Sequence, residues 1–494
     1  MHIVHIASEL APIAKVGGLA DVVHGLCREL NQLGHTTEIL LPKYDCLQLE
    51  LLSDLKVETP ELWASDGPYS FNNTIWSAHY DGLTLRLIET HHSQLYFNRE
   101  VIYGCPDDID RFTYFSRAAM EYLFKRGKHP DILHVHDWPT ALIPVLQKEI
   151  YSKVGFKPKK TVLTIHNMEH QGRCTPQILT RAGLPGNDLL DPDKMQDPYS
   201  FNHVNLLKGG IEYSDQITTV SPKYEIEIQS PEGGFGLQET VLKHRKKLKG
   251  ILNGIDCALW NPETDGYLFQ NYPADRVSKS TLPDVIAGKE ENKKQLRIQL
   301  GLAPSTHPLI GCITRLVPQK SPTLIKHAIE RTLEKGGQFV LLGSSPIPEI
   351  QNDFLALKEH YRTRRDVALI MDNDERLAHW IYAAADMFII PSLFEPCGLT
   401  QLIAMRYGTV PIARLTGGLA DTVFDVDTSI KPLDERNGFT FEFPDTGGVN
   451  WALDRAMACY KEHPKKWHSI ILNGMRTDHS WKHPAMQYLA LYKE

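Results

Sequence analysis

The chain has 494 residues, of which 42% are hydrophobic and 23% charged, and its formal net charge at pH 7 is −7. This length suggests two or three domains, because a soluble domain typically contains roughly 100–200 residues. The acidic balance argues against a nucleic-acid binder driven by its overall field, and no apolar run approaches the ~20 residues of a membrane span. We therefore expect neither a nucleic-acid nor a membrane partner.

The start of the chain and its cysteines indicate a compartment. Residues 2–6 form an apolar strand at once, without the charged leader, apolar core and cleavage site of a signal peptide. The eight cysteines are scattered and include no Cys-x-x-Cys pair. This pattern is more typical of reduced cytosolic thiols than of disulfides or a zinc site. We expect a cytoplasmic protein.

A glycine pair follows the first strand. Lys15, Val16, Gly17 and Gly18 precede a helix whose apolar residues form one stripe. The glycines let the backbone approach a ligand at the helix start, where Lys15 could add a charge for phosphate. Taken alone, the loop is more simply explained as a turn with a surface lysine. However, residues 17–23 recur almost unchanged at 417–423, again between a strand and a helix, as a pair of doubly wound domains would show.

Strands and helices alternate along both halves, which is the pattern of parallel sheets with crossover helices. The clearer strands are expected at 37–41, 83–88, 132–135, 161–165, 216–220, 309–313, 338–342, 368–371, 386–390 and 410–415. The predicted fold class is α/β, with two facing Rossmann-like doubly wound domains. A turn-rich stretch at 250–261 indicates a boundary. We expect an N-terminal domain at 1–250, a C-terminal domain at 251–478 and a last helix at 479–494 that could dock back on the first.

Polar residues end two strands of the first half. One strand runs into His134, Val135, His136, Asp137 and Trp138, and another into residues 164–167, which include His166. The alternating histidines beside an aspartate could suggest a metal, but they share a face only if the strand continues through both. We favour one histidine packed inside. Asp137, Trp138 and His166 would then face a cleft and offer hydrogen bonds and a stacking plane to a sugar.

Two cations lie on the loop that follows the first strand of the second half. Arg315 and Lys320 are five residues apart, just before a helix that begins near Pro322. Their charges suit a leaving diphosphate, because charge-assisted hydrogen bonds to it would stabilise the transition state. The alternative is a basic loop that is simply exposed to solvent. Asp-x-Asp pairs at 191/193, 372/374 and 425/427 could hold a divalent cation, but an acidic chain contains such pairs by chance. With the two cations available, we expect no metal and no cofactor.

Residues 391–402 follow a buried strand and place Glu395, Cys397 and Gly398 at a turn into a helix. Such turns lie at the carboxyl edge of a parallel sheet, where ligands of open α/β folds bind and where a helix start suits phosphate. Glu395 is therefore a candidate site residue. As an alternative, it could merely cap its helix.

Together these segments resemble bacterial glycogen synthase and plant starch synthase, which are retaining glucosyltransferases of the glycosyltransferase-B architecture. The likeness covers nearly the whole chain, and the common order of the motifs argues against chance. The motifs that carry it are residues 15–21, 136–138, 164–167, 253–256, 315–316 with 319–320, 394–401 and 416–419.

The resemblance implies transfer of glucose from ADP-glucose to the non-reducing 4-hydroxyl of an α-1,4-glucan such as glycogen, with retention of configuration. In the family's terms Lys15, Arg315 and Lys320 would hold the donor phosphates, and Glu395, Asn253 and His166 the transferred glucose. Asp137 would belong to the catalytic or acceptor side, next to Trp138. The donor pocket would further include Gly17, Gly18, Cys397, Gly398, Thr416, Gly417 and Gly418. Tyr96 and Tyr103 are candidate acceptor-side aromatics, although a place in the core explains either of them nearly as well.

The sequence departs from the family pattern at one informative position, and other functions of the same fold have to be weighed. Asn373 stands where many relatives carry a tyrosine near the adenine, so the alternative is a UDP-glucose-dependent glucosyltransferase with a small or polymeric acceptor. A non-catalytic glucan-binding protein of the same fold would not need to keep Lys15, Arg315, Lys320 and Glu395 together. A phosphorylase of this architecture generally needs pyridoxal phosphate, and no lysine context compels one. The sequence sets no oligomeric state.

Overall fold

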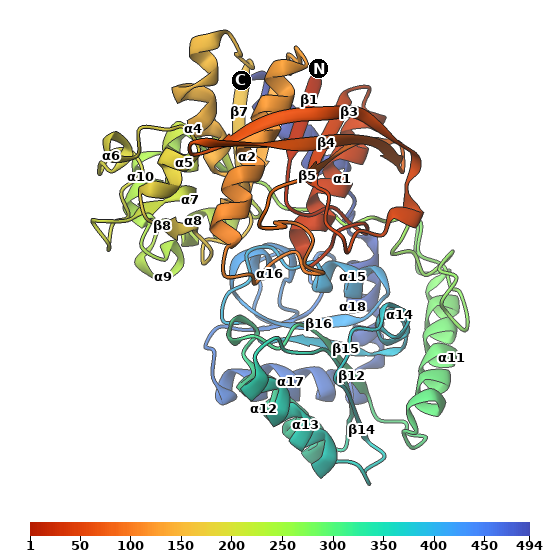
Figure 1. Ribbon diagram of the computed structural model, residues 1–494. Helices are drawn as coiled ribbons and strands as arrows, with labels where there is room; N and C mark the ends of the chain where they lie inside the picture. The colour runs from red at the N-terminus through yellow and green to blue at the C-terminus, as the bar shows by residue number, and fades with distance from the viewer. The chain divides into compact units, whose positions relative to one another are not determined.

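The structure, a computed structural model, describes all residues from Met1 to Glu494. The chain forms two compact units: unit 1 comprises Met1–Asn253 and Trp481–Glu494, and unit 2 comprises Gly254–Ser480. The first change of unit thus lies within the turn-rich stretch at 250–261. Each unit is built around a largely parallel sheet with helices on its faces (Figure 1), which is the predicted α/β class. None of the helices combines the length and the apolarity that crossing a membrane requires.

Unit 1 contains a nine-stranded sheet in the order β11-β10-β7-β6-β1-β2-β5-β4-β3. Its strands are β1 (His2–Ile6), β2 (Thr36–Pro42), β3 (Ser53–Asp66), β4 (Tyr69–Tyr80), β5 (Leu83–Thr90), β6 (Ile132–His136), β7 (Lys160–Ile165), β10 (Gln216–Thr219) and β11 (Leu248–Gly250). Strand β1 pairs in parallel with β2 on one side and with β6 on the other. The strand order therefore reverses between β1 and β6, and ligands of open α/β sheets bind beside the carboxyl ends of such strands.

The helices of unit 1 connect these strands, and a two-stranded ribbon, β8 (Arg173–Cys174) with β9 (Val204–Asn205), lies outside the main sheet. The helices are α1 (Gly18–Gln32), α2 (Asp108–Lys125), α3 (Asp137–Thr140), α4 (Leu142–Glu149), α5 (Gln177–Arg181), α6 (Gly186–Leu189), α7 (Leu206–Tyr213), α8 (Pro222–Glu227), α9 (Pro231–Gly234), α10 (Gln238–Lys243) and α19 (Lys482–Lys493).

Strands β3 and β4 were not among the expected elements. They form a long antiparallel hairpin whose register shifts at several points, and β4 continues antiparallel to β5. Much of β3 is exposed, including Val57 and Trp63. An antiparallel edge with one face in water carries no continuous apolar run, so the criterion of buried hydrophobic strands misses it.

The last helix returns to unit 1. Helix α19 and the preceding Trp481 pack with Ile3, Val22 and Leu26 in one buried core cluster. The indole lies against Gly25 of α1, where an added Cβ would come within 2.0 Å of its Nε1. A glycine inside this helix therefore allows close approach of the C-terminal segment.

Unit 2 contains a six-stranded sheet in the order β14-β13-β12-β15-β16-β17, with every neighbouring pair parallel. The strands are β12 (Leu309–Ile313), β13 (Gln338–Leu342), β14 (Val367–Ile370), β15 (Met387–Ile390), β16 (Val410–Arg414) and β17 (Phe439–Phe441). They are short and mostly buried on both faces, as parallel strands between helix layers are. The order reverses between β12 and β15, which places a second switch point there.

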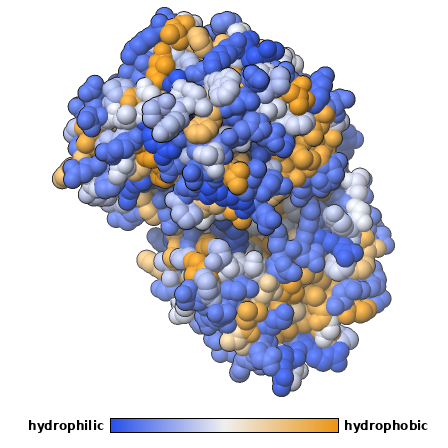
Figure 2. Space-filling view, in the orientation of Figure 1, coloured by the Kyte–Doolittle hydropathy of each residue, from blue (hydrophilic) through white to orange (hydrophobic).

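The helices of unit 2 are α11 (Leu282–Leu300), α12 (Pro322–Glu334), α13 (Pro348–His360), α14 (Glu375–Ala384), α15 (Thr400–Arg406), α16 (Gly417–Thr422), α17 (Thr446–Glu462) and α18 (Pro464–Arg476). Together with the sheet they enclose one large apolar core. On the face shown in Figure 2, hydrophilic residues dominate, with hydrophobic residues in separate groups between them.

Candidate active site

The switch point of unit 1 presents Asp137 and His166. Asp137 follows β6 and has a left-handed backbone with φ 54°, a conformation that aspartate tolerates better than most residues. Its Oδ1 accepts hydrogen bonds from the backbone N–H groups of His166 (2.7 Å) and Asn167 (3.4 Å). Burial raises the pKa of Asp137 to about 7, although these two hydrogen bonds oppose the rise. The ends of β6 and β7 are thus joined through one carboxylate.

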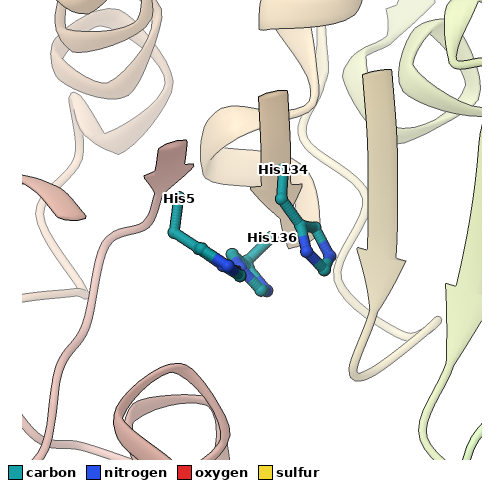
Figure 3. A group of neighbouring side chains, drawn as sticks. All are labelled: His5, His134 and His136. Atoms are coloured by element: carbon teal, nitrogen blue, oxygen red, sulfur yellow. The ribbon is translucent and has the colours of Figure 1, made fainter. Parts of the chain in front are cut away.

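The histidines of β6 differ from the expectation that only one is packed inside. His134 and His136 both have 0% exposure, because β6 runs through both and presents them on one face. His5 of β1 lies opposite His134 in the register and joins them (Figure 3). His134 is hydrogen-bonded to Tyr492 (2.7 Å) and to the hydroxyl of Thr164 (2.6 Å). Sequence reasoning missed His5, since only the pairing of β1 with β6 brings it close.

Glu9 is a second group that sequence reasoning missed. Its Oε2 accepts hydrogen bonds from the N–H groups of Val16 (2.6 Å) and Gly17 (2.8 Å), and its Oε1 accepts one from the hydroxyl of Tyr103 (2.8 Å). The amides of the glycine loop therefore already hold a carboxylate. Lys15 is paired with Asp21 of α1 (2.7 Å). The only signal in the sequence was that Glu9 comes shortly after β1.

The two tyrosines expected on the acceptor side have different surroundings. Tyr103 donates a hydrogen bond from its hydroxyl to Glu9, the carboxylate that binds the amides of the glycine loop. Tyr96 is only 1% exposed, its ring is stacked on His92 at 4.0 Å, and its hydroxyl accepts a hydrogen bond from Arg181 (3.0 Å). Tyr96 therefore has the place in the core that was the alternative to an acceptor-side position. Trp138 is partly buried and packs edge-on against Phe112.

The switch point of unit 2 brings Arg315 and Lys320 together. Both line a cavity of about 150 Å³ beside the carboxyl ends of β12 and β15, and Ser392 and Thr400 also line it. The guanidinium group of Arg315 is exposed and forms no ion pair. Lys320 forms an ion pair with Glu395, whose Oε2 also accepts a hydrogen bond from the hydroxyl of Ser392 (2.9 Å). Glu395 thus contacts Lys320, which lines the same cavity as Arg315, rather than acting only as a helix cap.

The second glycine pair serves close packing. The N–H of Gly418 donates to the carbonyl oxygen of Glu395 (3.0 Å), so this amide is not available as a free anion donor in this structure. Gly417 has φ +44°, and a Cβ there would lie 2.0 Å from the same carbonyl oxygen. A Cβ at Gly418 would lie 2.0 Å from the carbonyl oxygen of Cys397. Only glycines let the start of α16 approach residues 395–398 this closely.

The remaining predicted residues of the donor side are also placed. Gly398 has a left-handed backbone with φ +73°. Cys397, the residue before it, and Thr416, the residue before the second glycine pair, are both buried. Asn253, at the end of unit 1, is 5% exposed, and its Oδ1 is buried without a hydrogen-bond partner. Gln401 likewise has a buried Oε1 without a partner, while its Nε2 donates to the carbonyl oxygen of Gly398 (2.8 Å). Each of these two amide oxygens is an acceptor that can still take a hydrogen bond.

Comparisons with known proteins cover both units. The family model described as "Starch synthase catalytic domain" matches residues 2–243, and that described as "Glycosyl transferases group 1" matches residues 292–471. The chain is 51% identical over 494 residues to a glycogen synthase of Protochlamydia amoebophila (strain UWE25), covering 100% of this chain and 99% of that protein. It is 50% identical to the probable starch synthase 4, chloroplastic/amyloplastic, of Arabidopsis thaliana, covering 100% of this chain and 47% of that protein.

Solved structures similar to this chain are a starch synthase and a sucrose-phosphate synthase. The catalytic domain of starch synthase IV from Arabidopsis thaliana, bound to ADP and acarbose, superposes with a TM-score of 0.95 at 49% identity, covering 100% of this chain and 98% of that chain. A sucrose-phosphate synthase from Thermosynechococcus elongatus, with a TM-score of 0.59 and 17% identity, shares the fold alone.

Proposed function

Because this chain belongs to the family of glycogen and starch synthases, we propose that it transfers glucose from ADP-glucose to the non-reducing 4-hydroxyl of an α-1,4-glucan with retention of configuration. The chain is a glycosyltransferase-B glucosyltransferase with two Rossmann-like units. The observation that carries the proposal is the cavity at the switch point of unit 2, which Arg315 and Lys320 line while Lys320 is paired with Glu395.

The donor would bind at this switch point. Arg315 and Lys320 supply two positive charges for the diphosphate, and charge-assisted hydrogen bonds to phosphate are among the stronger ones in proteins. Glu395 receives both of its observed side-chain contacts on Oε2, so its Oε1 can accept a hydrogen bond from a glucose hydroxyl. Cys397 and the glycines of both turns would form the wall of the pocket.

Residues of unit 1 would complete the reaction. Lys15 would exchange Asp21 for a donor phosphate, beside the backbone of Gly17 and Gly18. His166 and the unpartnered Oδ1 of Asn253 would hold the transferred glucose. Asp137 and Trp138, together with Tyr103, would belong to the acceptor side.

Retention would follow a front-face path in which the departing phosphate oxygen takes the proton of the acceptor hydroxyl. Arg315 and Lys320 would neutralise the charge that develops on this oxygen, and exclusion of water would limit hydrolysis. We propose that the reaction needs no metal and no cofactor, and that it occurs in the cytoplasm, where the eight cysteines, all of them free thiols in the structure, would stay reduced.

The test is an assay of nucleotide release from ADP-glucose or UDP-glucose, with and without glycogen, in the presence of a chelator. We expect ADP release that depends on glycogen and survives the chelator, and little UDP release. Nucleotide release that does not depend on added glucan would contradict the proposal that the chain extends a polymer. A marked preference for UDP-glucose would favour the alternative donor.

A further inference from the structure

Three histidines form one hydrogen-bonded chain that ends at His166. Nδ1 of His5 lies 3.0 Å from Nε2 of His136, and Nδ1 of His136 lies 3.1 Å from Nε2 of His166. His5 and His136 have 0% exposure and His166 has 9%. Because the other hydrogen bond of His166 uses its backbone N–H, Nδ1 of its ring is left for a ligand.

The rings of this chain are neutral. Burial lowers the pKa of His5 and of His166 to about 3, and it lowers the pKa of His136 well below its usual range. A neutral imidazole carries one N–H and one lone pair. The two hydrogen bonds therefore have to run in the same direction along the chain, and only two arrangements exist.

The two arrangements differ at the ends of the chain. In the first, His5 donates to His136 and His136 donates to His166, so that His166 carries its proton on Nδ1. In the second, every donation is reversed, and His166 presents a lone pair at Nδ1 while His5 carries its proton on Nε2. Nε2 of His5 is buried and has no hydrogen-bond partner. The second arrangement would bury an N–H without an acceptor, which native proteins avoid more strictly than an idle acceptor.

We propose that His5 and His136 are positioning residues that hold His166 in its Nδ1–H tautomer, so that His166 donates a hydrogen bond to an oxygen of the sugar. That the acceptor of this hydrogen bond is a sugar oxygen rests on the proposed function. The Nδ1–H tautomer of His166 does not depend on it. Neither His5 nor His136 would touch the substrate.

A metal site is the competing interpretation of this cluster, and the geometry disfavours it. His134 is stacked on His136 with ring centroids 4.5 Å apart and an interplanar angle of 21°, and both ring nitrogens of His134 are already hydrogen-bonded, to Tyr492 and Thr164. His5 meets His136 edge to edge, so that Nδ1 of His5 points at Nε2 of His136 instead of at a shared ion. Lone pairs lie in the ring planes, so stacked rings do not converge on one ion. Figure 3 shows the ring of His5 meeting that of His136, with His134 beside them.

The direct test is NMR of the whole protein with ¹⁵N-labelled histidine, without substrate, at neutral pH. The ring nitrogens of His166 are identified as the signals lost in His166→Gln. We expect Nδ1 of His166 to be protonated and Nε2 to be a hydrogen-bonded acceptor. A proton on Nε2 of His166 would overturn the proposal, whether or not the protein transfers glucose.

Two variants of equal size test the role of His5. His5→Asn keeps an N–H donor where Nδ1 lies, whereas His5→Asp offers only acceptors and should reverse the chain. We expect His5→Asp to move the proton of His166 to Nε2 and to lower kcat/KM roughly tenfold, and His5→Asn to keep both near the wild-type state. The exposed His79→Asn in the same sheet is the control for substitution itself.

Each outcome decides the question. An unchanged His166 tautomer in His5→Asp would show that His5 does not set it. If the variants fail to fold, the tautomer in the wild-type protein remains the test. If the wild type shows the Nδ1–H tautomer but no glucose transfer, the proposed function fails and the chain of histidines stands.

Discussion

Lys320 and Glu395 form an ion pair at the carboxyl edge of the sheet in unit 2, although 75 residues separate them in the chain. The carboxylate oxygen that Lys320 contacts is also the one that accepts the hydrogen bond from Ser392. The pair is only partly exposed, so each charge stabilises the other where water screens them weakly. Catalysis would therefore start from a carboxylate that is already oriented.

Replacing Glu395 by glutamine should reduce turnover severely. The amide keeps the size of the side chain but lacks the negative charge that fixes Lys320 and attracts a sugar hydroxyl. We expect kcat to fall by about 10²–10³-fold, measured as glucan-dependent ADP release. Glu349→Gln, at an exposed position of α13, should retain the wild-type rate. A Glu395→Gln enzyme within about threefold of wild type would remove Glu395 from the site.

Asp137 should make stability depend on pH in an unusual direction. The unfolded chain loses this proton near the ordinary value of about 4, but the folded protein keeps it up to about 7. Between these values the unfolded state binds fewer protons, so this contribution to the free energy of unfolding decreases as pH rises. It is fully present below the unfolded pKa and is lost above the folded one.

Asp137→Asn removes this titration and still tolerates the left-handed backbone. We expect wild type to lose stability relative to the variant between pH 4 and 7, as measured by urea unfolding, and the difference to level off above pH 7. A difference that grows in favour of wild type with rising pH would mean that the folded state favours the ionised carboxylate.

Gly417→Ala should disturb the packing behind Glu395. The new Cβ would lie 2.0 Å from the carbonyl oxygen of Glu395, at a backbone φ of +44°, so the turn or α16 has to move. We expect a loss of stability of about 1–3 kcal/mol together with a lower kcat. Gly266→Ala, where no atom lies within 4 Å, is the control and should leave the melting temperature within a degree or so. Equal melting temperatures for the two variants would contradict the packing argument.

Gly25→Ala should destabilise the protein, although alanine is normally about 1 kcal/mol better than glycine inside a helix. Its Cβ would overlap the indole of Trp481, and such overpacking typically costs about 1–3 kcal/mol. Thermal unfolding measures the effect. In a Trp481→Leu background the cost should disappear, so that the double-mutant cycle shows coupling; additive effects would indicate that the indole does not limit residue 25.

The strands predicted from sequence were those whose burial leaves a continuous apolar run. Residues 338–342 and 309–313 coincide with β13 and β12, and 386–390 overlaps β15. The half-exposed β3 and β4 and the three-residue β17 carry too little apolar signal for this criterion. Their presence depends on pairing with neighbours, which local periodicity does not encode.

The residues of the candidate site likewise fall into those that the sequence predicts and those that only the structure reveals. Arg315, Lys320 and Glu395 follow strands directly, so the rule that ligands bind at the carboxyl edge of a parallel sheet identified them. Glu9 contacts Val16 and Gly17 through a local turn of the loop, 7 and 8 residues on, which has no motif to mark it. His5 contacts His136, 131 residues away, and only the strand order brings these two together. The burial of His134 likewise required knowing that α19 covers it, since Tyr492 contacts His134.

The return of the final residues to unit 1 makes unit 2 an insertion within it, and this has a consequence for biosynthesis. A nascent chain leaves the ribosome from its N-terminus, at about 5–20 residues per second. The rest of unit 1 is therefore made before Trp481 and α19, while the whole of unit 2 is translated, and its apolar surface around Ile3 and Leu26 stays uncovered in the meantime. The half of the protein that is made first is the half that is finished last.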